Sequence, residues 1–333
     1  MSDSRLVEEW EYARLEVEGH RADVTMTRSD KRNAMNEPLL EQLREAIEAA
    51  DAHDEVRALV LQGDGPVFCA GMDLEMMRDR KESGATAERF PRLLETIESV
   101  SVPTVAAVKR AAPAGAFELT LPFDFRVLGS DARYGVLEVQ LGTFPHGGAT
   151  QRLPRLVGLS NAKRIVLTGD WVDPEEARTM GLVHDVVPDN EVDARARDLA
   201  DDLCENAPLG MANAKVALNA ALETPLDEGL ELERTLGAQL DDTYDYHEGF
   251  SARIEDREPE FEGRSRASRS RPRSRAWRPH GTRPASGRPT RGRLGRSSRA
   301  RHRGCPPRRT GGRVRCRRRS PARTGPTPRT GRA

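Results

Sequence analysis

The sequence predicts an α/β fold of stacked strand–helix turns, followed by a region made only of helices. The main observation is a recurring unit in which a short apolar strand leads through a small-residue turn into a helix. These units comprise 56–61 with 72–80, 102–108 with 116–121, and 125–128 onward. Strand signals vanish after residue 191, where three or four amphipathic helices, broken near Pro208 and Pro225, are expected. Repeated units of this kind indicate one α/β body rather than two independent domains.

The elements before these units are predicted from periodicity and capping. Residues 12–18 alternate polar with apolar side chains, as a strand with one buried face does, and Val24 and Met26 repeat the period. A helix is expected to begin at Asn36, a plausible N-cap, with Pro38 in its first turn. Apolar residues at helical spacing then predict one buried face, formed by Leu40, Leu43, Ile47 and Ala50.

The formal net charge of zero hides a segregation of charge. Residues 264–333 hold 25 arginines and no Lys, Asp or Glu, which leaves 28 basic against 53 acidic residues in 1–263, a net charge of −25. Dense salt screens the self-repulsion of such an acidic surface. We therefore expect a halophilic archaeal source, with an ordinary acidic enzyme as the alternative. Loss of the fold at low KCl concentration would separate the two.

The basic C-terminal segment needs its own interpretation. Its Arg, Pro, Gly, Ser and Thr residues cannot bury enough apolar surface to offset the entropy of ordering, so a disordered tail is predicted over 257–333. Arginines attract polyanions, which makes nucleic-acid binding the rival function from another class. With Trp277 as its one aromatic residue and no recognisable nucleic-acid fold, base stacking is not supported. Out-of-frame translation of a GC-rich gene from about codon 264 is the preferred interpretation.

Cysteines and apolar runs exclude other classes. The four cysteines show neither CxxC pairing nor metal-ligand spacing, so no metal site is predicted. No stretch has the pattern of a secretory signal or the length of a membrane span. We expect a cytoplasmic protein with no membrane partner.

Two small-residue turns that open onto helices carry the first chemical signal. They lie at 68–74 and 112–119. Unpaired backbone N–H groups at helix N-termini favour negative charge. Two such turns facing each other would hold a thioester oxygen as it becomes an enolate, and one donor of such an oxyanion hole typically contributes about 10²–10³-fold in rate.

Two glutamates stand in apolar surroundings. Glu118 lies between Phe117 and Leu119, and Glu138 lies in the otherwise apolar stretch 134–145. Burial raises the pKa of a carboxyl group, as a general acid or base that works near neutrality requires. A single glutamate of this kind is more often solvated surface than a catalytic group, so the pattern alone does not decide its role.

Residues 10 to about 260 resemble the crotonase superfamily and, within it, the enoyl-CoA hydratases. The resemblance is specific because several motifs match in order. They are Arg32-Asn33-Ala34-Met35-Asn36, Phe68–Leu74 (F-x-A-G-x-D-L), Gly115–Leu119 (G-G-x-E-L), Glu138–Pro145 (E-x-x-L-G-x-x-P), Gln151–Arg155, Leu167–Gly169 and Gly181–Val183. The resemblance implies a crotonase-type spiral of strand–strand–helix turns. It also implies an acyl-CoA-binding catalytic core over 1–188 and a helical oligomerisation or lid region over 189–256.

The resemblance also implies the site residues. The backbone N–H groups of Met72 and Gly115 would form the oxyanion hole, while Glu118 and Glu138 would hold the attacking water. The implied substrate-binding residues are Arg32, Ala34, Ala70, Asp73 and Leu74, and Asp73 is equally well explained as a helix cap. Glu118 is the preferred base that directs water to C3 and Glu138 the acid at C2, although coupled carboxylates share their titration.

The implied reaction is syn addition of water to a trans-2-enoyl-CoA, which gives a 3-hydroxyacyl-CoA. No cofactor is implied, since coenzyme A is part of the substrate and the thioester already acidifies the α-carbon. The presence of both glutamates favours a hydratase over the runner-up, an enoyl-CoA isomerase, because isomerases often keep only one. Relatives assemble as trimers or pairs of trimers, so a homotrimer or hexamer is implied.

Four positions depart from the family pattern or fall outside it. Arg110 stands where relatives usually have a glycine, and it is expected to clash, to narrow the pocket or to point outward. Ala114 and Ala116 replace glycines, which bears on how closely a thioester approaches. His146 is interpreted as a solvent-facing turn residue outside the site.

Overall fold

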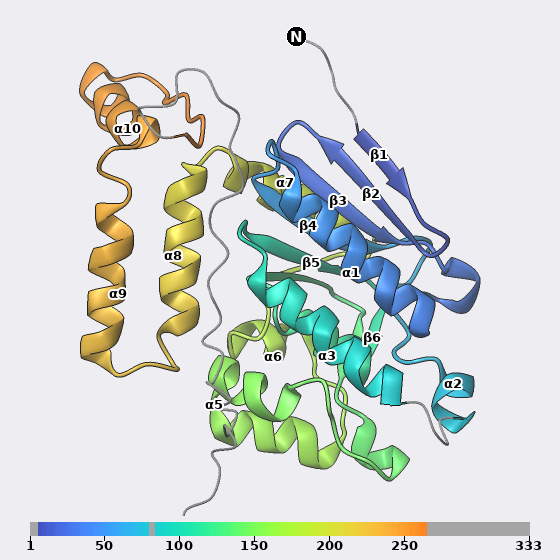
Figure 1. Ribbon diagram of the computed structural model, residues 1–333. Coiled ribbons are helices and arrows are strands. Elements are labelled where there is room, and N and C mark those ends of the chain that lie inside the picture. Colours follow the sequence, from blue (N-terminus) through green and yellow to red (C-terminus); the bar gives the residue numbers. More distant parts are fainter. Residues whose placement is uncertain (1–5, 80–83, 265–333) are drawn as a thin grey trace, which may run out of the picture. The chain divides into compact units, whose positions relative to one another are not determined.

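The centre of the fold is a mixed sheet of seven strands (Figure 1). The computed structural model describes residues 6–79 and 84–264. The strand order is β1-β2-β3-β4-β5-β7-β9; β1 to β3 pair antiparallel, and the later neighbours pair parallel. Their bounds are β1 (Leu6–Glu9), β2 (Ala13–Glu18), β3 (Arg21–Met26), β4 (Ala58–Gly63), β5 (Thr104–Val108), β7 (Phe125–Gly129) and β9 (Asp185–Val187). The predicted α/β class is confirmed.

One face of the sheet is covered by α1 (Glu37–Ala52) and α3 (Gly84–Ser99), which also pack against each other. The predicted start of α1 is confirmed, since the Asn36 side chain accepts a hydrogen bond from the Leu39 N–H at 3.0 Å. The predicted apolar face of this helix is buried in the main core, as are Leu59 and Leu61 of β4.

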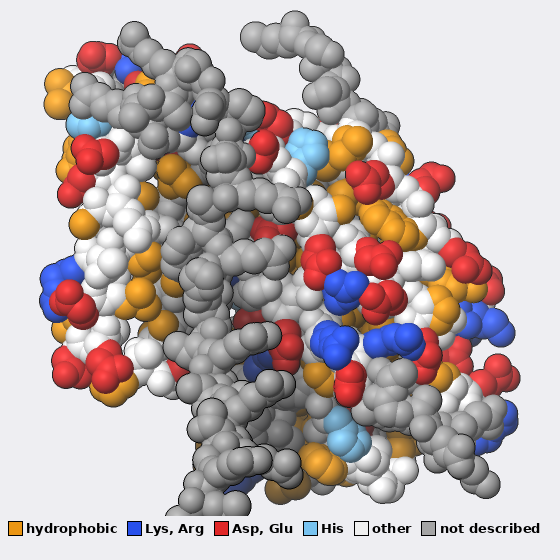
Figure 2. All heavy atoms as spheres, in the orientation of Figure 1, with side chains coloured by type: hydrophobic (Ala, Val, Ile, Leu, Met, Phe, Trp, Pro, Cys, Tyr) orange, Lys and Arg blue, Asp and Glu red, His pale blue; other side chains and the backbone are white. Residues whose placement is uncertain are grey.

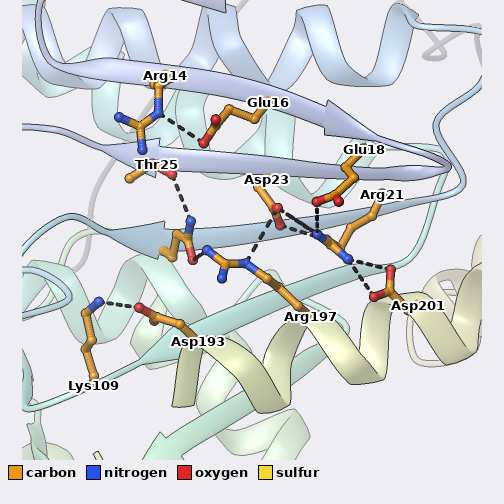
Figure 3. Close-up of polar contacts among 11 residues, drawn as sticks. Arg14, Glu16, Glu18, Arg21, Asp23, Thr25, Lys109, Asp193, Arg197 and Asp201 are labelled. Carbon is orange, nitrogen blue, oxygen red and sulfur yellow. Dashed lines mark hydrogen bonds and ion pairs between the residues drawn. The ribbon is translucent and has the colours of Figure 1, made fainter. Parts of the chain in front are cut away.

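The opposite face is covered by α7 (Val192–Cys204). Alternate residues of a strand point to opposite faces, so Ala58 and Val60 of β4 pack in this second, smaller core. Beside it runs a chain of polar contacts between α7 and the strands (Figure 3). Arg21 of β3 pairs with Asp23 at 3.1 Å and with Asp201 of α7 at 2.5 Å.

A second, two-stranded sheet positions the candidate site. It pairs β6 (Ala111–Pro113) with β8 (Arg133–Gly135) in parallel. The strand β6 leads directly into α4 (Gly115–Thr120), and the strand β8 leads towards the 3-10 helix η2 (Glu138–Leu141). The two glutamates predicted to be catalytic therefore lie shortly after the ends of the neighbouring strands β6 and β8.

The remaining helices include the predicted C-terminal helical region. Pro208 is the first residue of α8 and Pro225 the N-cap of α9, as the predicted breaks require. The 20-residue α5 consists of two helical parts joined at Gly158, whose φ of 77° is not helical. Bounds are η1 (Ser29–Lys31), α2 (Leu74–Asp79), α5 (Ala149–Thr168), α6 (Pro174–Thr179), α8 (Pro208–Ala220), α9 (Leu226–Ala238) and α10 (Tyr244–Glu255).

The chain after α10 stays packed for several residues beyond the boundary predicted at 257. The Asp245 carboxylate accepts hydrogen bonds from the N–H groups of Glu262 and Gly263, and Arg57 donates to the Phe261 carbonyl at 2.7 Å. The Arg-rich tail from residue 265 on, with the predictions of disorder, nucleic-acid binding and out-of-frame translation, lies outside the described residues. None of the helices in the described ranges has the length and apolarity to cross a membrane.

Candidate active site

The two small-residue turns lie against each other, as the sequence predicts. A Cβ built on Gly115 would lie 3.0 Å from Met72 Cγ, and one built on Gly71 would lie 3.1 Å from the Pro113 carbonyl oxygen. Side chains at either glycine would push the turns apart, and Gly71 also has a φ of 94°. The glycines therefore allow backbone N–H groups of both turns to approach one ligand.

The hydrogen bonds of these turns involve the neighbours of Met72 and Gly115. The Met35 N–H donates to Gly71 O at 2.8 Å, and the Asp73 N–H donates to Met35 O at 2.9 Å. Because N–H groups alternate in direction along an extended chain, the Met72 N–H points away from Met35. Gly115 is the first residue of α4, so its N–H has no acceptor in a preceding helical turn.

The peptide that joins Ala114 to Gly115 connects the turn with Glu118. Ala114 has φ 51° and ψ −120°, a conformation that L-residues seldom adopt, and its N–H donates to Gly135 O at 2.8 Å. Its carbonyl accepts the Glu118 N–H at 3.1 Å. The hydrogen bond polarises the same peptide whose N–H belongs to Gly115, which strengthens that N–H as a donor.

Glu118 is buried, with 3% of its surface exposed, and backbone groups hold its carboxylate. The Ala149 N–H donates to Oε1 at 3.0 Å. Burial raises the pKa of Glu118 to about 7. The Ala149 N–H opposes that rise, the Glu138 charge adds to it, and hydrogen bonds from the N–H groups of Gly147 and His146 oppose it. Glu118 is therefore partly ionised near neutral pH, as a general base requires.

Gly147 allows this loop to press on Glu118. A Cβ at Gly147 would lie 2.9 Å from Glu118 Oε2 and would overlap the Phe90 ring from α3. The Glu118 carboxylate and the Phe90 ring therefore both lie against the backbone of Gly147. The apolar ring contributes to the burial that raises the pKa of Glu118.

Glu138 is the second buried carboxylate, with 7% of its surface exposed. It is the first residue of η2, which ends at Gly142 in a left-handed conformation. Burial raises its pKa, against hydrogen bonds from the N–H groups of Glu138 itself and Leu137. Its Oε2 atom has no hydrogen-bond partner among the described residues. The structure thus brings the two predicted glutamates into electrostatic contact, and one buried oxygen of Glu138 lacks a partner in the described part of the chain.

The predicted substrate-binding segment at 32–36 runs beside the first turn. The Ala70 N–H donates to Arg32 O at 2.9 Å. Asn33, fully buried with φ 55°, donates through Nδ2 to the carbonyls of Val67 and Phe68 at 2.9 and 3.1 Å and to that of Asp64. These bonds fix the loop geometry, a role for Asn33 that the sequence does not predict.

Asp73, Ala34 and Leu74 differ in their surroundings. Arg28 pairs with Asp73 at 2.8 Å and also donates to Ala34 O at 2.8 Å. Asp73 Oδ1 accepts the N–H groups of Glu75 and Met76 at the start of α2, and Arg28 lowers the pKa of Asp73. These contacts match the helix-cap interpretation of Asp73. Leu74 is 71% exposed, and Arg32 is also exposed.

Arg110 points outward. It has a φ of 63°, the left-handed conformation in which glycine is favoured. Its side chain is 63% exposed, and Nη1 lies 3.7 Å from Asp189 Oδ2. Of the three outcomes expected for Arg110, the structure shows this one, so the side chain does not narrow the site.

Arg126 supports the C-terminal end of α4, and the sequence does not predict this role. It is 2% exposed and donates to the carbonyls of Thr120, the last residue of α4, of Phe123 in the turn that follows, and of Leu182. A cation at a helix C-terminus is favourable because carbonyl oxygens are unpaired there. The only sequence signal was one arginine in an otherwise apolar strand.

Comparisons with known proteins identify relatives of this chain. Residues 17–264 match the family model described as enoyl-CoA hydratase/isomerase. The chain is 37% identical to the 2,3-dehydroadipyl-CoA hydratase of Escherichia coli (strain K12) over 241 residues, which are 72% of this chain and 94% of the relative. It is 36% identical to the mitochondrial methylglutaconyl-CoA hydratase of Mus musculus over 245 residues, 72% of this chain and 78% of that relative.

Solved structures show the same fold. An enoyl-CoA hydratase from Bacillus anthracis superposes with a TM-score of 0.70 at 29% identity, covering 78% of this chain and 99% of that one. One from Polaromonas sp. JS666 gives a TM-score of 0.72 at 27% identity, covering 75% and 99%. The predicted crotonase fold is confirmed. In the described ranges, no group of three or more His, Cys, Asp or Glu residues is arranged to hold a metal ion.

Proposed function

The chain belongs to the enoyl-CoA hydratase/isomerase family, and from this premise we propose that it is an enoyl-CoA hydratase. It would add water syn across the 2,3 double bond of a trans-2-enoyl-CoA. The observation that carries the proposal is the pair Glu118 and Glu138, both buried and electrostatically coupled. Glu118 lies one turn along α4 from Gly115.

In the proposed reaction, the Met72 and Gly115 N–H groups hold the thioester oxygen and stabilise the enolate that forms there. Glu118 removes a proton from water as its oxygen bonds to C3. Glu138, in its acid form, delivers a proton to C2 as the enolate collapses. The substrate gains one water, and proton exchange returns Glu118 to its base form and Glu138 to its acid form. The raised pKa of both groups suits this exchange near neutral pH.

The test is hydration of crotonyl-CoA in molar KCl, followed by loss of the conjugated thioester absorbance. Glu118→Gln and Glu138→Gln are each expected to lower kcat by about 10²–10⁴-fold, the usual contribution of a general acid or base. Both variants should keep the unfolding midpoint of the parent chain at acid pH. Full turnover in both variants would refute the mechanism. If the parent chain shifted the double bond of a 3-enoyl-CoA but hydrated nothing, the activity would be that of an isomerase.

We also propose that the chain assembles as a trimer or a pair of trimers. Apolar side chains lie exposed along the C-terminal helices, and Figure 2 shows such patches over α8 and α9. The exposed apolar side chains of the C-terminal region include Leu218, Leu222, Leu226, Leu230 and Phe250. Light scattering in molar KCl is expected to give three or six copies, and a monomer would contradict the proposal.

A further inference from the structure

The loop at 138–149 contains one glutamate of the acid–base pair and holds the other. It begins with Glu138, and its last residues supply the N–H groups that hold Glu118. Between them lie Phe144 and His146, both exposed, with ring centroids 4.6 Å apart. His146 thus contributes its backbone to the Glu118 carboxylate and its imidazole to an aromatic pair beside it.

Two landmarks give the direction of a bound acyl chain. The thioester carbonyl belongs at the N-terminus of α4, where Gly115 lies beside Met72. The carbons that react lie beside Glu118, three residues further along the helix. The Ala149, Gly147 and His146 N–H groups of the loop donate to Glu118, and Gly147 also lies against the Phe90 ring. An acyl chain that continues past C3 therefore leads towards the part of the loop that carries Phe144 and His146.

The loop offers few charged side chains to the distal end of that acyl chain. His146 is the only basic residue in 138–149, and Glu138 is the only acidic one. The next basic side chain, Arg152, pairs with Glu98 at 2.7 Å and donates to Gly147 O at 3.2 Å. The body carries a net charge of −25, and Figure 2 shows Asp and Glu side chains over much of one face. An anionic acyl group thus needs a local donor, which the imidazole supplies.

We propose that His146 is a specificity residue that binds a carboxylate at the distal end of the acyl chain, with Phe144 covering the methylene carbons before it. The inference rests on the proposed hydratase function, because it places the acyl chain by the hydratase geometry. The names of two relatives, 2,3-dehydroadipyl-CoA hydratase and methylglutaconyl-CoA hydratase, denote acyl groups of dicarboxylic acids. The preferred substrate is therefore the CoA thioester of an unsaturated dicarboxylic acid.

The test compares two six-carbon substrates that differ only at the distal end, trans-2-hexenoyl-CoA and trans-2-hexenedioyl-CoA. The full chain is expected to hydrate the second with a kcat/KM at least tenfold higher at pH 6.5. His146→Gln should remove about tenfold of that preference, the worth of one charge-assisted hydrogen bond, mainly through KM. His146→Lys should retain it, because the ammonium group also donates to a carboxylate. His53→Gln, at the end of α1, is the control and should leave the preference unchanged.

The outcomes separate the two proposals. If the chain hydrates neither substrate nor crotonyl-CoA, the hydratase proposal fails. If it hydrates hexenoyl-CoA at least as well as hexenedioyl-CoA, the inference about His146 is wrong and the hydratase proposal stands. An equal loss with both substrates in His146→Gln would likewise overturn it, since that result indicates a role of the loop in holding Glu118 alone.

Discussion

Two regions of this protein bury carboxylates to a similar degree, but only one provides them with cations. On the α7 face, Asp23 is 6% exposed and pairs with Arg21, and Arg197 lies 3.6 Å away (Figure 3). In the candidate active site, Glu118 and Glu138 are 3% and 7% exposed, and backbone N–H groups are the donors that hold them. Burial raises the pKa of Asp23 as well, but Arg21 opposes it.

The difference shows how a carboxylate is kept for structure or for chemistry. A guanidinium group beside a buried carboxylate favours its charged form and opposes the rise in pKa that burial causes, and here it also ties β3 to α7 through Asp201. Backbone donors stabilise the charge only in part. A glutamate held in this way can therefore exchange a proton near neutral pH, at a cost to stability that the rest of the fold offsets.

The largest expected effect on stability comes from breaking the α7 face. Arg21→Met leaves Asp23 buried without its main partner, which typically costs about 3–5 kcal/mol in the free energy of unfolding. The matched control is Arg14→Met on the neighbouring strand. Its pair with Glu16 is more exposed, and the expected cost is at most about 1 kcal/mol. Urea unfolding in molar KCl measures both.

A second variant sharpens this result. Arg21→Met combined with Asp23→Leu removes both charges and is expected to recover most of the loss, since an apolar pair of similar volume often replaces a buried ion pair without cost. Equal losses in Arg21→Met and Arg14→Met would show that the network is a surface feature, and the comparison between the two regions would no longer hold.

A smaller effect is expected from the active-site side of the comparison. Because the pKa of Glu118 is raised from 4.5 to about 7, the folded state binds its proton more tightly than the unfolded state. The stability from this group is fully present below pH 4.5 and is lost as pH rises towards 7. Glu118→Gln should therefore match the parent chain near pH 4.5 and exceed it by roughly 1–3 kcal/mol above pH 7.

The measurement is the difference in unfolding free energy between variant and parent across pH 4.5–8. Glu45→Gln, an exposed change on α1, is the control for the loss of one negative charge and should give a difference that stays flat. A flat difference for Glu118→Gln as well would mean that the folded protein does not perturb this carboxylate.

The parts of the molecule that the sequence predicted are those encoded by local signals. Asn36 and Pro38 define the start of α1 because capping involves only neighbouring residues. Glu118 and Glu138 were proposed as the acid–base pair because each belongs to its own ordered motif. The strands β6 and β8 were not predicted, since three-residue strands are defined by pairing partners distant in the chain, such as Ala111 with Arg133.

The contacts that tertiary structure creates were also beyond the sequence. His146 was interpreted as an outward turn residue, and its side chain is exposed, yet its N–H group acts on Glu118 from 28 residues away. Arg126 has no local signal that would link it to the carbonyls of Thr120 and Phe123, at and just after the end of α4. In both cases the contact depends on how distant parts of the backbone are arranged, which the identities of neighbouring residues do not reveal.

The smallest expected effect concerns Arg110, where the left-handed backbone conformation is tested rather than the side chain. Its φ of 63° costs about 1–2 kcal/mol for an L-residue, and a glycine would relieve this cost while losing about 0.5–1 kcal/mol to the entropy of the unfolded chain. Arg110→Ala removes the same exposed pair with Asp189 but keeps the Cβ. Arg110→Gly is therefore expected to be more stable than Arg110→Ala by about 1 kcal/mol or less in urea unfolding.

Both variants should hydrate crotonyl-CoA within twofold of the parent, because the side chain points away from the site. A larger gain in rate with glycine alone would show that the backbone conformation of this turn limits the approach of the thioester.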